Sequence, residues 1–101
     1  MLHAQNITGT ISGTVVDSKG GVVPNVTVTL TNEDTHAIMR TVTTDSNGQY
    51  AAPLLPIGHY SVAAETTGFK KVVHSGLILN VNDKLAVNLT LEVGTVTETV
   101  Q

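Results

Sequence analysis

The sequence predicts an all-β fold, a seven-stranded antiparallel Greek-key β-sandwich. Three observations lead to this prediction. Apolar and polar residues alternate along seven short segments. Turn residues separate these segments at the spacing of roughly 8–12 residues that is typical of sandwiches. No segment has the periodicity of a helix, and the length of 101 residues suits one domain with one core.

The predicted strands follow one another along the whole chain. Each is rich in β-branched or aliphatic residues and is bounded by Gly, Pro, Asn or Asp, which favour turns. In order they are Ile11–Asp17, Val26–Asn32, Ile38–Asp45, Gln49–Leu54, Tyr60–Glu65, an extended run from Phe69 to Val81 that is interrupted at Ser75-Gly76, and Leu85–Val93.

The alternation also predicts which side chains face the core. Val26–Asn32 is the clearest case, because its aliphatic side chains point one way and its threonines point the other. The residues expected on the core side are Ile11, Gly13, Val15, Val26, Val28, Leu30, Tyr60, Val62, Ala64, Leu77, Leu79, Val81, Leu85, Val87, Leu89, Leu91 and Val93.

Three connections have distinctive turn chemistry. Asp17–Gly21 and Asp45–Gly48 each begin with an Asp that can accept hydrogen bonds from its own backbone two residues on. Between Pro53 and Gly58 two prolines stand close together, and proline cannot donate within a central ladder. We therefore expect this segment to leave the sheet edge and form a corner.

The protein has only three aromatic side chains, Tyr50, Tyr60 and Phe69, and no Trp. Each ring can bury about 150–250 Å² of surface. Rings this scarce are expected in the core, where they would hold the two sheets together.

The two ends of the chain are predicted to differ from the sandwich at 11–94. Residues 1–10 read as a lead-in segment, in which Asn6–Thr10 could form a weak edge strand and His3-Ala4-Gln5 fits either a signal-peptide remnant or an artificial start. Residues 95–101 form a terminal strand or a linker. Here Thr95, Val96, Thr97, Glu98, Thr99 and Val100 alternate again. This segment pairs with an edge of its own domain, leads into a following domain, or adds to a neighbouring molecule.

Composition and motifs argue against several classes of function. The net charge is −3 with only 5 Lys and Arg, which does not suit nucleic-acid binding. No apolar run approaches the roughly 18 residues of a membrane span. There is no cysteine, the four histidines lack the spacing of metal ligands, and the turn at Asp45 fits a hairpin better than a calcium loop. No nucleophile motif is present, so we expect no enzyme activity, no metal and no cofactor. Lys70-Lys71 is the one basic pair, and edge protection is its expected role.

Four segments in order resemble the carboxypeptidase regulatory-like domain: Gly13–Leu30 (GTVVDSKGGVVPNVTVTL), Thr43–Tyr50 (TTDSNGQY), Leu55–Val62 (LPIGHYSV) and Thr67–Lys71 (TGFKK). This module is similar in fold to transthyretin and to Cna B-type repeats. The resemblance covers Ile11 to Val100 and is strongest to the copy at the N-terminus of Oar-like TonB-dependent outer-membrane receptors.

The resemblance implies a non-catalytic accessory domain outside the bacterial cytoplasm, secreted, at the cell surface or in the periplasm. It implies that Tyr50, Leu55, Tyr60 and Phe69 are core and corner residues. The first strand has no Lys for the isopeptide bond of Cna B-type domains. The chain also lacks the Tyr-Arg-Gly-Ser motif at the C-terminus of transthyretin-like hydroxyisourate hydrolases.

These observations leave a leading hypothesis and its rivals. The leading hypothesis is a structural or protein-interaction module that acts through its sheet edges and loops. One alternative is a subunit of an extracellular assembly, a filament for example, joined when Thr95–Val100 or Asn6–Thr10 adds to a neighbour's sheet. A second is a carbohydrate-binding module, and a third is a hydrolase.

Overall fold

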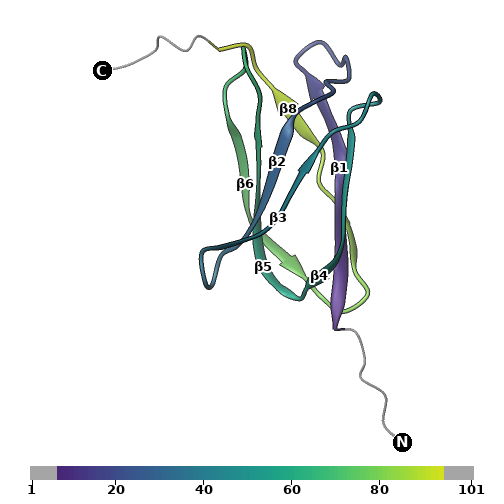
Figure 1. Cartoon of the computed structure of the whole chain (residues 1–101), viewed down its shortest axis with the longest axis vertical. Coiled ribbons are helices and arrows are strands. Elements are labelled where there is room, and N and C mark those ends of the chain that lie inside the picture. Colours follow the sequence, from purple (N-terminus) through teal and green to yellow (C-terminus); the bar gives the residue numbers. More distant parts are fainter. Residues whose placement is uncertain (1–6, 95–101) are drawn as a thin grey trace, which may run out of the picture.

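A computed structural model describes residues 7–94 and confirms the all-β prediction (Figure 1). It contains eight strands in two sheets that pack face to face. Within the described residues no helix is long and apolar enough to cross a membrane.

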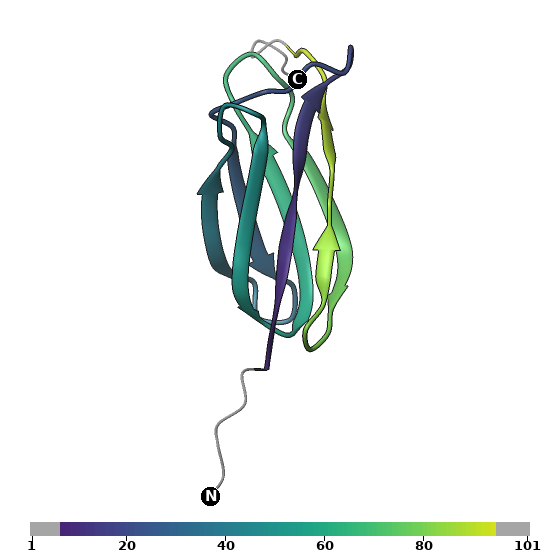
Figure 2. The ribbon, with the colours of Figure 1, turned by 90° about the vertical axis from the view of Figure 1, so that its right-hand side faces the viewer.

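The first sheet is organised around one long strand, β1 (Thr8–Asp17). On one side β1 pairs antiparallel with β4 (Gln49–Pro56). On its other side it pairs in parallel with two short strands in succession, β7 (Lys84–Ala86) and β8 (Leu89–Leu91). Figure 2 shows β1 running the length of the molecule beside the C-terminal strands.

The second sheet is antiparallel throughout, in the order β3-β2-β5-β6. Its central strands are β2 (Thr27–Asn32) and β5 (Gly58–Glu65). Its edges are β3 (Ala37–Thr43) and β6 (Val72–Leu79). The chain crosses between the sheets after β1, β3, β4 and β6, so both sheets contribute to one core.

The core lies between the sheets and follows the alternation of the sequence. Val26, Val28 and Leu30 are buried while the threonines between them face outward. The other buried apolar residues are Ile11, Val15, Tyr50, Ala52, Leu55, Tyr60, Val62, Ala64, Leu79, Val87, Leu89 and Leu91. The predicted core faces of Val26–Asn32 and Tyr60–Glu65 are thereby confirmed in full, and those of the other three segments in part. Burial of aliphatic side chains at about 25 cal/mol per Å² supplies the main stabilising term.

The prediction of seven strands is wrong by one, because Leu85–Val93 is not a single strand. The ladder with β1 breaks at Val87 and Asn88, and β7 and β8 lie on either side of the break. The expectation that every pairing is antiparallel is also wrong, since both short strands run parallel to β1. Two residues expected on the core side, Val81 and Val93, are 49% and 73% exposed because they lie beyond the ends of their strands.

Several strand boundaries also differ from the prediction, most of them by one to three residues. The first strand begins at Thr8, three residues before Ile11. The prolines between Pro53 and Gly58 do not interrupt the ladder early, because β4 continues to Pro56 along an edge where the missing N–H is not needed. The corner itself is a single residue, Ile57. The expected interruption at Ser75-Gly76 is a β-bulge within a continuous β6.

Replacement of Gly13 by Ala tests the close approach of the C-terminal segment to β1. A Cβ atom at Gly13 would lie 1.9 Å from the carbonyl oxygen of Val87, far inside contact distance. We expect G13A to lower the free energy of unfolding by about 3 kcal/mol, the upper end of the usual cost of overpacking. Urea denaturation measures the loss. G21A is the control, because a Cβ there meets only the Asp17 carboxylate at 3.3 Å or more, and a loss as large as that of G13A would contradict the account.

Candidate functional site

The four residues expected in the core or at the corner take different positions. Tyr50 on β4 and Tyr60 on β5 are buried between the sheets, and so is Leu55 near the end of β4. Phe69 is only half-buried and packs against the edge of the core. It lies outside the strands, in the segment between β5 and β6, where its backbone forms an isolated bridge with Val93.

The hydroxyl of Tyr50 binds the backbone at the break between β7 and β8. It donates a hydrogen bond of 2.6 Å to the buried carbonyl of Val87. At the next residue, the side-chain oxygen of Asn88 accepts a hydrogen bond of 3.0 Å from the backbone N–H of Thr14 on β1. Burial raises the pKa of Tyr50 to about 12. The phenol is therefore a neutral structural donor rather than an acid or a nucleophile.

The hydroxyl of Tyr60 closes the corner between β4 and β5. It donates a hydrogen bond of 2.6 Å to the carbonyl of Pro56. Desolvation raises the pKa of Tyr60, and the positive charge of Arg40 partly opposes this rise. The guanidinium of Arg40 donates to the carbonyl of Pro53 at 3.0 Å, which joins β3 of one sheet to β4 of the other.

The two turns with an N-terminal Asp use their carboxylates internally. Asp17 accepts hydrogen bonds of 2.9 Å from the N–H groups of Lys19 and Gly21, and these bonds lower its pKa. Asp45 accepts in the same way from Asn47 and Gln49. Among residues 7–94, no three His, Asp or Glu side chains gather where they could hold a metal ion. In both turns the carboxylate thus holds the backbone of its own turn.

Acidic side chains of the β2–β3 loop reach across the second sheet. Asp34 lies 3.1 Å from the ring of His59, although both side chains are largely exposed. Glu33 accepts a hydrogen bond of 3.0 Å from the backbone N–H of Gly76, in the bulge of β6. Gly76 has a φ of 73°, which favours glycine. The bulge on β6 is thus fixed by a side chain of the β2–β3 loop, which lies on the other side of β5.

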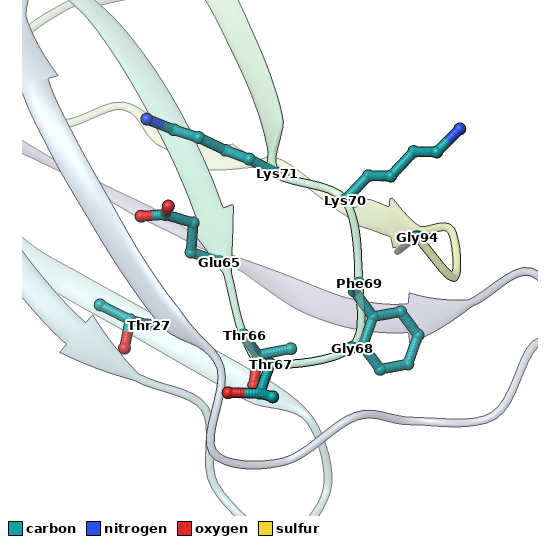
Figure 3. A pocket seen from close by; sticks show the side chains of 9 residues that line it. All are labelled: Thr27, Glu65, Thr66, Thr67, Gly68, Phe69, Lys70, Lys71 and Gly94. Carbon is teal, nitrogen blue, oxygen red and sulfur yellow. The ribbon is translucent and has the colours of Figure 1, made fainter. Parts of the chain in front are cut away.

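A shallow groove of about 490 Å³ opens at the end of the sandwich that carries the β5–β6 loop (Figure 3). It is lined by Thr27, Glu65, Thr66, Thr67, Gly68, Phe69, Lys70, Lys71 and Gly94. Figure 3 shows that the two lysine side chains point in different directions. Lys70 lies 3.9 Å from Glu92, with both side chains exposed. The groove therefore combines one half-buried ring with hydroxyls and separated charges, an arrangement suited to weak polar contacts.

A second groove, of about 450 Å³, lies at the other end of the molecule. It is formed by the start of β1, Leu54 and the β6–β7 loop, with the lining residues Thr8, Gly9, Thr10, Leu54, Asn82, Asp83 and Lys84. Leu54 has a φ of 57° and an exposed side chain, because it lies in the bulge where β4 passes β1. Neither groove is lined by a histidine, and each has a single carboxylate, Glu65 in the first and Asp83 in the second.

Three of the sheet edges in the described part of the chain have features that hinder strand pairing. The edge of β4 carries Pro53 and Pro56. The opposite edge of that sheet consists of two strands of three residues each, which are too short to template a partner. On β3 a bulge interrupts the register, and the charged Arg40 is directed across the sandwich to Pro53.

The fourth edge, β6, is the most open. It is eight residues long and contains no Pro and no Lys, Arg, Asp or Glu. Among the described strands it pairs only with β5, and its bulge is its one irregularity. Val73 and Ile78 on this strand are 54% and 56% exposed. A long apolar edge of this kind is suited to accepting another strand.

Comparison with known proteins gives the family. The model of the carboxypeptidase regulatory-like domain matches residues 10–92. This chain belongs to that family. The TonB-dependent transporter Oar of Myxococcus xanthus is 36% identical over 83 residues, which are 81% of this chain and 8% of the transporter. The resemblance predicted from the sequence is confirmed, and the chain spans only a small part of that relative.

Solved structures share the fold of this carboxypeptidase regulatory-like domain. The Bacillus anthracis TIE protein has a TM-score of 0.71 at 22% identity and is matched over 86% of this chain and 17% of its own. The 5-hydroxyisourate hydrolase of Klebsiella pneumoniae has a TM-score of 0.66 at 25% identity, over 86% of this chain and 92% of its own. The prediction of a transthyretin-like sandwich is confirmed.

Sequence reasoning missed the role of Val87 and Asn88, which make the junction with β1. The alternation of Leu85–Val93 runs through them without a visible break. The one signal is Asn88 itself, a poor strand former whose amide can replace a backbone group. The proposed strand-addition residues Thr95–Val100 lie outside the described part of the chain.

Replacement of Tyr50 by Phe tests its hydrogen bond with Val87. The change leaves a buried carbonyl without a donor, so we expect the free energy of unfolding to fall by about 1–3 kcal/mol. Y60F is the matched control, because the carbonyl that it leaves belongs to the exposed Pro56 and can bind water. Urea denaturation of both variants gives the comparison, and a larger loss in Y60F than in Y50F would contradict this ranking.

The raised pKa of Tyr50 predicts a specific loss of stability in alkali. The unfolded chain releases this proton near pH 10, whereas the folded protein retains it until about pH 12. The native state binds more protons in this window, so stability is complete below pH 10 and falls as the pH rises towards 12. Unfolding measured between pH 9 and 12 should show a steeper decline for the wild type than for Y50F. Parallel curves would show that Tyr50 does not titrate differently in the two states.

Proposed function

We propose that this chain is a non-catalytic interaction module on the periplasmic or cell-surface side of a bacterial cell, and that it forms part of a larger protein. Its family and its likeness to part of the transporter Oar support this proposal. Because the relative is a TonB-dependent transporter, this likeness supports a position of the module outside the cytoplasm.

The open edge of β6 is the observation that carries the proposal. The polar groups of the interior serve the fold, as the hydroxyls of Tyr50 and Tyr60 do when they bind backbone carbonyls. The grooves are shallow and hold no cluster of acids, bases and nucleophiles in the described residues. What remains available for recognition is backbone along β6, with two exposed aliphatic side chains beside it.

The path of the chain suits a rigid spacer as well as a docking unit. The start of β1 and the stretch that follows β8 lie at opposite ends of the sandwich (Figure 1). Segments joined to these two places would therefore be held apart by the length of the domain. A module of this kind keeps the segments on its two sides at a fixed separation and leaves the β6 edge open to a partner.

Carbohydrate binding is the second candidate, and the groove at Phe69 is the observation that favours it. The groove brings an aromatic ring next to the hydroxyls of Thr66 and Thr67. Sugar-binding platforms rely on exposed aromatic faces, and this ring is half-buried and stands alone. The groove therefore supports weak contact with a glycan better than selective binding.

Calorimetric titration and a turnover assay distinguish these functions. We expect no heat beyond dilution when the chain is titrated with cello-, xylo- and chito-oligosaccharides, and no acceleration of 5-hydroxyisourate decay followed by absorbance. Saturable sugar binding that F69A abolishes, and that the distant variant I38A retains, would favour the carbohydrate module instead. Turnover that exceeds the buffer rate would contradict the non-catalytic assignment.

A further inference from the structure

We propose that the edge of β6 accepts residues 95–100 from a second copy of this chain as an added strand. The inference rests on the proposed function as an edge-binding module and names its partner. Strand addition supplies backbone hydrogen bonds for affinity and side-chain matches for register. The edge and the segment each have a feature that supports the pairing.

On β6 the two exposed aliphatic side chains stand at a defined spacing. Val73 lies opposite Ala63, and Ile78 lies opposite His59. Val73 and Ile78 are five residues apart on β6, whereas Ala63 and His59, their partners on β5, are four apart. The bulge at Ser75-Gly76 accounts for the extra residue of β6. Val73 and Ile78 therefore occupy the same face, the outer one, two alternations apart along the ladder.

The terminal segment repeats this spacing in its sequence. Val96 and Val100 are four residues apart, with Glu98 between them and threonines at the alternate positions. An added strand can thus place one valine beside Val73 and the other beside Ile78. Glu98 then falls opposite the bulge, the one place on the edge where the ladder is irregular. Aliphatic β-branched pairs are favourable across strands, so the match selects a register.

The direction of the chain favours a second copy over the same molecule. Glu92–Gly94 runs antiparallel to Gly68–Lys70, with hydrogen bonds from Lys70 N–H to the Glu92 carbonyl and from Gly94 N–H to the Gly68 carbonyl. Since Gly68–Lys70 leads into β6, the chain at Gly94 is moving away from β6. To reach the edge of its own β6, the segment would have to reverse direction after Gly94, and addition to a second copy needs no such reversal.

Disulfide trapping tests the pairing directly, because the chain has no cysteine of its own. The single variants V73C and I78C are each mixed with V96C and with V100C under mild oxidation. We expect two of these four mixtures to give hetero-disulfide dimers at least tenfold faster than the mixture of I38C with V100C. Antiparallel addition favours V73C with V100C and I78C with V96C, and parallel addition favours the other two. Ile38 is the matched control because it is 65% exposed on β3, the opposite edge of the same sheet.

Three results would overturn the proposal. One is equal trapping by the β3 control. Another is an intramolecular disulfide as the main product of a dilute V73C/V100C or V73C/V96C double variant, which would show that the segment folds back on its own edge. The third concerns the unmodified chain, whose mass by light scattering should rise above that of the monomer with concentration. V73K should remain monomeric, and I38K should associate as the wild type does. A wild type that is monomeric near 1 mM would refute the added strand. These experiments are independent of the sugar and turnover assays. The proposed function therefore stands even if the strand-addition experiments fail.

Discussion

The structure depends on how closely the segment around Val87 approaches β1. Gly13 has no side chain, and the Val87 carbonyl occupies the space that a Cβ atom would take. The same carbonyl accepts the hydroxyl of Tyr50, while the amide of Asn88 replaces a backbone acceptor for Thr14. Three places that are far apart in sequence, Gly13-Thr14, Tyr50 and Val87-Asn88, thus let one extended segment shift its pairing along β1 without leaving a buried side-chain polar group unpaired.

This junction determines what the rest of the molecule can present. Because β7 and β8 cover one side of β1 and β4 covers the other, the longest of the described strands is paired on both sides. In the described residues no buried side-chain polar atom lacks a hydrogen-bond partner. The buried hydroxyls of Tyr50 and Tyr60 therefore hold the backbone of the fold.

The sequence predicted the core faces well because alternation is a local property of a strand. Val26–Asn32 shows this, since its buried and exposed residues follow directly from its pattern. The break at Val87 was not predictable, because alternation continues through it and only the approach of β1 reveals the shift. Parallel pairing was missed for the same reason, as no local pattern names a strand's partner. The openness of β6 likewise depends on sheet order, although its lack of charge is plain in the sequence.

The contrast among the sheet edges is the strongest argument that β6 is used. Soluble β-proteins commonly protect exposed edges, because an unprotected one invites aggregation. Here one edge has two prolines, another is cut into short strands, and the third has a bulge and the inward charge of Arg40. Because three edges are protected in three different ways, the lack of proline and charge on β6 requires an explanation of its own. On the apolar β6, the bulge is instead fixed by a hydrogen bond to Glu33. An open edge with a fixed shape is best explained as a binding surface for an added strand of matching register.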